Sequence, residues 1–162
     1  MNRERFDLII VFASRLRKEY NIKTIALGKY DNKRLVNSIS PTIISLINQT
    51  TLKQAISLIS RCQFFIGPDS NLLHIASCLN VETIGLYGPT PKDYVYPYFH
   101  RENIIQAKLN INDECWGVDK LRCPPSLYQT PCLSMKKIRV DEVISKVAKK
   151  LIKTRHSKSM HA

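Results

Sequence analysis

Two short segments of the chain combine residue types and spacing that suit a phosphate group. The residues concerned are Asp69, Ser70, Asn71, His74, Gly88, Pro89 and Thr90. The first four open a predicted helix, and its N-terminus offers backbone N–H groups without intrahelical acceptors and the positive end of the helix dipole. A threonine hydroxyl and a histidine ring add further hydrogen-bond donors. These residues therefore predict an anion site, with a phosphate or diphosphate as its ligand.

Regular elements on both sides of these segments are expected to position them. Residues 63–67 form a short apolar run that predicts a strand, and Pro68-Asp69-Ser70 turns the chain into a helix over residues 71–79. A second strand is predicted over residues 82–87, directly before Gly88. Loops at the carboxyl ends of neighbouring parallel strands form the usual ligand crevice of an open α/β sheet.

The rest of the chain continues the alternation of helices and strands. Helices are predicted over residues 3–20, 31–38, 51–59 and 140–152, and strands over residues 23–27, 42–46 and 103–106. Thr51 and Gln54 form a capping box that marks the start of one helix. Alternating strands and helices indicate βαβ units, so we predict an α/β fold with a Rossmann-like parallel sheet and helices on both faces.

The length and the composition favour one domain. The chain has 162 residues, 44% of them hydrophobic, which allows one sizeable core. We expect the domain to cover residues 1–153 and residues 154–162 to form a disordered basic tail. No apolar run approaches the roughly 18 residues of a membrane span, and the N-terminus has no apolar signal core, so we expect a cytoplasmic protein.

The net charge of +12 is concentrated late in the chain. Lysine and arginine crowd residues 136–158, where the only acids are Asp141 and Glu142. A solvated helix face explains this run more simply than a specific anionic partner does. The lysines lack a recognised nucleic-acid motif and interleaved aromatic residues, so we expect no nucleic-acid partner.

The five cysteines do not indicate a disulfide framework, because the count is odd. Cys62 and Cys78 lie in apolar elements and are expected to be small core residues. Cys115, Cys123 and Cys132 are spaced more widely than the C-x-x-C pairs of typical zinc sites. These three thiolates with a fourth ligand, such as His100 or water, could hold a metal, but free thiols in a packed loop are the preferred interpretation.

The stretch IGPDSNLLHIASCLNVETIGLYGPTPKDY, residues 66–94, resembles glycosyltransferase family 9, the bacterial heptosyltransferases of lipopolysaccharide core synthesis. In that family a strand is followed by Gly-x-Asp-(Ser or Thr)-Gly-x-x-His and later by Gly-Pro-Thr. A weaker resemblance extends from Arg3 to about Ile152. It implies the C-terminal, nucleotide-sugar-binding half of a two-domain GT-B enzyme, without the first strand of that half and without the N-terminal acceptor domain.

The resemblance also implies a reaction. A nucleotide-diphosphate sugar such as ADP-heptose would bind between the Asp69 and Gly88 loops, with Asp69 and Ser70 capping the helix and the next amides facing the diphosphate. Transfer in the family is inverting and needs no metal or other cofactor, so helix amides and nearby donors stabilise the departing diphosphate. The acceptor would be lipid A or core oligosaccharide at the inner membrane surface of a Gram-negative bacterium.

The sequence departs from the family pattern in two ways. Asn71 stands where the motif has glycine, which adds a side chain near the anion, and Asn71→Gly is expected to tighten nucleotide binding. No catalytic residue can be nominated, because the presumed base carboxylate belongs to the N-terminal domain. The chain is therefore interpreted as a fragment, as one part of a split enzyme, or as an inactive remnant that retains at most nucleotide binding. A basic nucleic-acid-binding domain is the lowest alternative.

Overall fold

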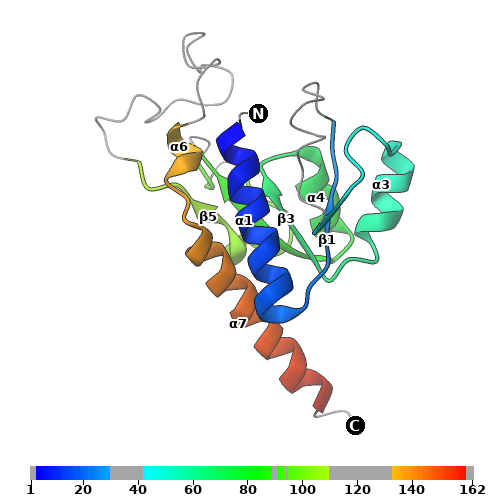
Figure 1. Ribbon diagram of the computed structural model, residues 1–162. Helices are drawn as coiled ribbons and strands as arrows, with labels where there is room; N and C mark the ends of the chain where they lie inside the picture. Colours follow the sequence, from blue (N-terminus) through cyan, green and yellow to red (C-terminus); the bar gives the residue numbers. More distant parts are fainter. Residues whose placement is uncertain (1–2, 30–41, 89–90, 94, 110–132, 160–162) are drawn as a thin grey trace.

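Parallel strands lie between two layers of helices (Figure 1). The computed structural model describes residues 3–29, 42–88, 91–93, 95–109 and 133–159. Its helices are α1 (Arg3–Tyr20), α3 (Leu52–Ile59), α4 (Asn71–Cys78), the 3-10 turn η1 (Arg101–Asn103), α6 (Leu133–Lys136) and α7 (Val140–Ser159). Its strands are β1 (Thr24–Ala26), β2 (Ile43–Ser45), β3 (Phe64–Pro68), β4 (Glu82–Tyr87) and β5 (Ile105–Gln106).

The described strands form two parallel groups. Strand β1 pairs with β2, and the other three strands are ordered β3-β4-β5. In the larger group Pro68 of β3 lies beside Leu86 of β4, so these two strands end at the same edge of the sheet. The predicted α/β architecture, a parallel Rossmann-like sheet with helices on both faces, is confirmed.

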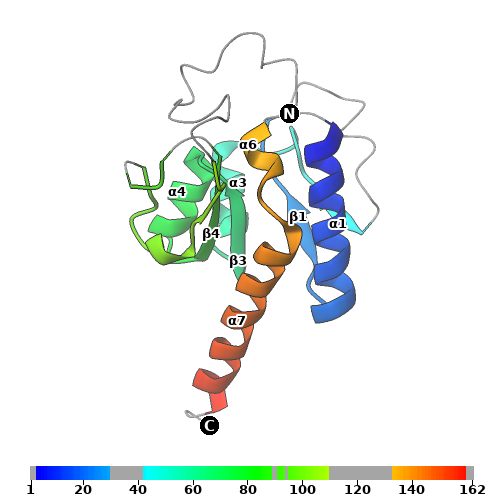
Figure 2. The ribbon, with the colours of Figure 1, turned by 90° about the vertical axis from the view of Figure 1, so that its left-hand side faces the viewer.

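Side chains of β3 alternate between the two helix layers, as the period of a strand requires. Phe64 and Ile66 pack on the core that α1 and α7 share with Ile84 of β4. Phe65 points the other way and packs with residues of α3 and α4, including Ala76. Figure 2 shows α7 and α1 together over one face, with α4 on the opposite side of β3 and β4.

Local signals fix several helix ends. Thr51 and Gln54 form the predicted capping box at the start of α3, with both reciprocal hydrogen bonds present. Asn21 follows α1 with φ 56° and Asn80 follows α4 with φ 56°. Asparagine tolerates the left-handed conformation that closes a helix better than most residues do, so these two positions end their helices without glycine.

Four details differ from the sequence predictions. Strand β3 includes Pro68, its last residue, which pairs with Leu86 of β4; proline is tolerated at the end of a strand and at a sheet edge. Helix α7 continues to Ser159 instead of ending near Ile152, since no glycine or proline follows, and residues 154–159 are helical rather than a disordered tail.

Cys78 is exposed at the end of α4 and not in the core. Lys150 is not simply solvated, because its Nζ lies 2.8 Å from Glu82 Oε1.

Two further differences concern short elements: β5 is shorter than residues 103–106 and is preceded by η1, and α6 lies where no helix was predicted. The helix predicted over residues 31–38 lies outside the described residues. Among the helices that the structure describes, none is both long and apolar enough to cross a membrane.

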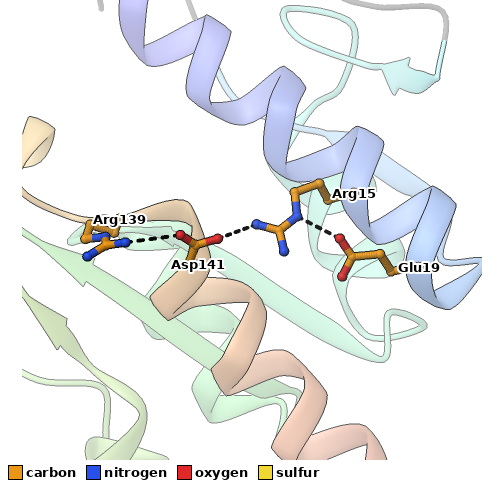
Figure 3. Close-up of polar contacts among 4 residues, drawn as sticks. All are labelled: Arg15, Glu19, Arg139 and Asp141. Carbon is orange, nitrogen blue, oxygen red and sulfur yellow. Dashed lines mark hydrogen bonds and ion pairs between the residues drawn. The ribbon is translucent and has the colours of Figure 1, made fainter.

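An ion-pair chain ties the two helices of one layer together (Figure 3). Arg15 of α1 lies 2.7 Å from Glu19 on its own helix and 2.6 Å from Asp141 of α7, and Arg139 lies 3.3 Å from the other Asp141 oxygen. These hydrogen bonds lower the pKa of Asp141, with Arg15 as the largest cause and Arg139 next. The packing of α1 on α7 is therefore linked to the charge of one carboxylate.

Candidate functional site

The loop after β3 delivers the chain directly into α4. Ser70 caps this helix in an extended conformation (φ −160°, ψ 159°), and its Oγ accepts from the Leu73 amide at 3.4 Å. Asn71 and Leu72 therefore begin the helix, where amides have no acceptor within the helix. These amides are the donors that an anion at this position would use.

Asn71 is exposed and occupies the first helical position. It is not among the described residues with positive φ, so its backbone does not need the freedom of glycine. The glycine of the family motif would differ from Asn71 only by removing a side chain from the approach to the amides. The expected effect of Asn71 on the space near the anion is therefore the difference that matters at this position.

Asp69 and His74 form a pair across the first turn of α4. His74 Nε2 lies 3.2 Å from Asp69 Oδ1, and the two side chains are 36% and 19% exposed. Ser70 is the N-cap, and the Asp69 carboxylate contacts the imidazole ring and orients it. A histidine held by a carboxylate keeps a defined ring orientation, which suits a hydrogen bond from its other ring nitrogen to an anion.

Gly88 begins the loop after β4 and is packed against α6. A Cβ at this position would lie 2.8 Å from Ser134 Oγ and 3.0 Å from Met135 Sδ. Both distances are below normal contact, so any larger residue here would force the Ser134 or Met135 side chain of α6 to move. The sequence analysis assigned Gly88 to ligand binding, and the structure adds this packing role.

Gln106 holds the same loop and was not identified from the sequence. Its Nε2 donates to the Gly88 carbonyl at 2.5 Å, and its Oε1 accepts from the Lys92 amide at 2.9 Å. Gln106 ends β5, the strand beside β4, and its partner in the register is Tyr87. A polar residue at the carboxyl end of the next parallel strand is the signal by which it could have been found.

Tyr87 lies beneath the site. It is fully buried, and within the described structure its hydroxyl has no hydrogen-bond partner. Burial, with a smaller contribution from the negative charge of Asp69, raises the pKa of Tyr87 to about 12. A buried hydroxyl without a partner is uncommon, because leaving it unpaired costs about 1–3 kcal/mol. Tyr87 is thus a donor near Asp69 that the described residues leave unused.

The structure brings together five of the seven predicted site residues, namely Asp69, Ser70, Asn71, His74 and Gly88. Pro89 and Thr90 lie outside the described residues, as do Cys115, Cys123 and Cys132. His100 is described, and its Nδ1 is buried without a partner among the described residues. No group of three or more His, Cys, Asp or Glu side chains suitable for a metal occurs in the described part of the chain.

Comparison with known families decides the assignment. Residues 18–121, well over half of the chain, match glycosyltransferase family 9 (heptosyltransferase). The chain belongs to this family. The match includes the Asp69 loop, α4 and Gly88, so the predicted resemblance is confirmed on the segment that carried it.

Individual relatives agree with this assignment. Lipopolysaccharide heptosyltransferase 2 of Escherichia coli K12 is 37% identical over 62 residues, which are 38% of this chain and 18% of that protein. Lipooligosaccharide heptosyltransferase 2 of Haemophilus ducreyi is 42% identical over 65 residues (39% and 19%). Its counterpart in Campylobacter jejuni serotype O:2 is 28% identical over 150 residues (93% and 42%). The chain thus spans less than half of each of these relatives, and no solved structure matches it significantly.

Proposed function

We propose that this chain is the donor-binding part of a heptosyltransferase-like glycosyltransferase and that it binds a nucleotide-diphosphate sugar such as ADP-heptose. The observation that supports this most is the Asp69-Ser70 loop and helix α4 beside Gly88, at the shared carboxyl edge of β3 and β4, in a chain of glycosyltransferase family 9. A helix N-terminus at such an edge is a favourable position for a diphosphate.

Each residue of the loop has a proposed task. The amides of Asn71 and Leu72 bind the diphosphate, and Ser70 keeps the helix end in place. His74, oriented by Asp69 at 3.2 Å, donates a further hydrogen bond to the diphosphate. As the sugar departs, negative charge grows on that group, and donors that are already in position stabilise it without a metal ion.

The other half of the reaction is assigned to polypeptide outside this chain. This proposal rests on the family resemblance, which implies an acceptor site and a base carboxylate in an N-terminal domain, and on the length of the matched relatives beyond the aligned residues. We propose that a separate or preceding N-terminal half completes the enzyme. The acceptor is lipid A or core oligosaccharide at the cytoplasmic surface of the inner membrane of a Gram-negative bacterium, and the basic residues of α7 favour such an anionic surface.

Calorimetric titration with ADP-heptose and with ADP tests the donor site. We expect the wild-type chain to bind both ligands and His74→Ala to lose about 10–100-fold in affinity, the usual effect of one hydrogen bond to a charged group. Ser57→Ala is the matched control, because Ser57 is exposed on α3 and away from this loop. Equal affinities of the His74 variant and the wild type would rule out the proposed role of His74.

A transfer assay separates an active donor half from an inactive remnant. Heptose transfer after mixing with the N-terminal part of a family member, and none by this chain alone, is the result that the proposal predicts. Binding of ADP-heptose without transfer in that mixture would favour the remnant. Transfer by this chain alone would contradict the assignment of the base to another polypeptide.

A further inference from the structure

Gln106, the last residue of β5, lies on the α4 face of the sheet. Its neighbours Ile105 and Ala107 are buried in the core beneath α1 and α7. Because successive side chains of a strand point to opposite faces, Gln106 points the other way, as does its register partner Tyr87, which packs on Leu73 of α4. The N-terminus of α4 forms the candidate site. Gln106 therefore belongs to the side of the sheet on which that site is built.

The carboxamide of Gln106 joins two backbone groups that lie four positions apart in the sequence. Its Nε2 donates to the Gly88 carbonyl at 2.5 Å, and its Oε1 accepts from the Lys92 amide at 2.9 Å. In the described part of the chain, no other hydrogen bond is seen from the Lys92 amide or to the Gly88 carbonyl. A carboxamide can donate and accept at once, which an ionised carboxylate cannot. Gln106 thus fixes Gly88 and Lys92 relative to β5 with the two halves of one group.

Gly88 leaves the sheet beside the Asp69 loop. Pro68 of β3 pairs with Leu86 of β4, so Asp69 directly follows one partner and Gly88 comes two residues after the other. Neighbouring strands lie about 4.8 Å apart, so the two loops begin about one strand spacing from each other. Ligands of open α/β sheets bind between such loops. A shift of Gly88 would therefore change the space that is available beside the Asp69 loop.

The helix α6 and Gln106 hold this loop in different ways. Ser134 and Met135 of α6 pack against Gly88 and leave no space for a larger residue. Gln106 also holds the Lys92 amide, which gives the loop a second fixed point. A loop that must be ordered when its ligand binds costs conformational entropy, and a loop that is already held avoids this cost. The carboxamide can thus favour binding without touching the ligand.

We propose that Gln106 is a positioning residue of the donor site. Its carboxamide holds Gly88 and Lys92 so that the loop after β4 is already in place beside the Asp69 loop when the diphosphate binds. This inference rests on the proposed function, because it assumes that the ligand lies between these two loops. It extends the site from β3 and β4 to the end of the third strand of this sheet.

Gln106→Met tests the proposal, because methionine is similar in length and unbranched but makes neither hydrogen bond. Gln106→Glu is a second variant, which while ionised keeps an acceptor for the Lys92 amide and loses the donor to the Gly88 carbonyl. Gln63→Glu is the control, since Gln63 is exposed and directly precedes β3, at the opposite end of that strand from Asp69. Urea unfolding shows that each protein is folded, calorimetric titration gives its affinity for ADP, and NMR gives the hydrogen exchange of the Lys92 amide.

We expect both Gln106 variants to bind ADP about 3–10-fold more weakly than the wild type, as ordering one or two groups on binding would cause. The control should stay within about twofold of the wild type, the effect of a remote surface change. Exchange of the Lys92 amide should be at least about tenfold faster in Gln106→Met, because its acceptor is lost.

A purely structural Gln106 would lower the free energy of unfolding and leave the ADP affinity of the folded variants unchanged. That result overturns the inference while the proposed function stands, and unchanged exchange at Lys92 overturns it as well. A wild type that does not bind ADP defeats the proposed function and this inference with it. If neither Gln106 variant folds, Gln106 is required for folding and the positioning role is rejected.

Discussion

The Asp69 carboxylate and the His74 imidazole lie 3.2 Å apart across the first turn of α4, at the edge where β3 and β4 end. This pairing distinguishes the loop from an ordinary capped helix, because the cap is provided by Ser70. The acid contacts the histidine and orients its ring. Several measurable consequences follow from this arrangement and from the packing around it.

The Asp69–His74 pair is expected to act as a unit in ligand binding. Asp69→Asn should weaken ADP binding by about 3–10-fold, less than His74→Ala, because the ring remains but loses its charged partner. The double variant should show a coupling energy of about 0.5–3 kcal/mol, as interacting residues do. Calorimetric titration of the wild type, the two single variants and the double variant with ADP measures this coupling energy. Strictly additive effects on the binding free energy would show that the pair has no joint role.

Asn71→Gly is expected to tighten ADP binding, because it removes an exposed side chain from the approach to the first helix amides. The same change should lower the free energy of unfolding by about 0.5–1 kcal/mol, since glycine is a poor helix former. Calorimetry and urea unfolding measure the two effects separately. No gain in affinity would argue against a phosphate at this helix end.

Gly88→Ala should destabilise the protein by about 1–3 kcal/mol, because the added methyl group meets Ser134 and Met135 of α6. Urea unfolding measures the loss. Ser60→Ala on the exposed end of α3 serves as a control and should change stability by less than about 0.5 kcal/mol. A neutral Gly88 variant would mean that α6 does not pack on this loop as described.

Tyr87 predicts a loss of stability at high pH. Its pKa is raised to about 12 in the folded protein, so the folded state favours the neutral phenol. The unfolded chain does not share this preference for the neutral phenol. The free energy of unfolding should therefore fall as the pH rises above the pKa of tyrosine in the unfolded chain, near 10. Tyr87→Phe should remove that part of the decline. An unchanged pH profile in the variant would assign the decline to other groups.

Tyr87→Phe also separates stability from binding. It removes a buried hydroxyl that has no partner among the described residues, so at neutral pH we expect it to be neutral or stabilising by up to about 1 kcal/mol. Weaker ADP binding by this stable variant would identify the hydroxyl as a ligand donor. Unchanged binding would identify it as a packing residue only.

The Arg15–Asp141 pair predicts acid sensitivity (Figure 3). The folded pKa of Asp141 is lowered, so its contribution is present above the unfolded pKa near 3.9 and is lost as pH falls through the lower folded value. Asp141→Asn should therefore be less stable than the wild type at pH 7. The two proteins should be equally stable at a pH low enough to protonate Asp141 in both the folded and the unfolded wild type. Glu142→Gln, an exposed neighbour, is the control. A constant difference at all pH values would exclude the ion pair as its cause.

Much of the fold could be predicted because its signals are local. The capping box of Thr51 and Gln54, the strand over Glu82–Tyr87 and the start of α4 each depend on residues a few positions apart. Cys78 shows the limit of this approach, since its apolar neighbours suggested burial while the end of α4 exposes it. The end of α7 was missed because the residues after Ile152 neither continue the apolar pattern nor contain a helix breaker.

The sequence predicted the residues of the candidate site but not the long-range contacts that hold them in place. Asp69, Ser70 and His74 follow one another in sequence, so their shared loop was visible in advance. Gln106 reaches Gly88 only because β5 lies beside β4, and the contact of Gly88 with α6 joins positions that are far apart in the chain. Such long-range contacts require the order of the strands and the placement of the helices, which one sequence does not specify.

The most direct test of the donor site is an NMR titration of the isotopically labelled chain with ADP. We predict saturable shifts centred on the amides of residues 69–74 and 88, with residues of α3 and the last turn of α7 unaffected. No shifts at millimolar ADP, or shifts confined to the lysine-rich α7, would contradict the account that this loop binds the nucleotide diphosphate.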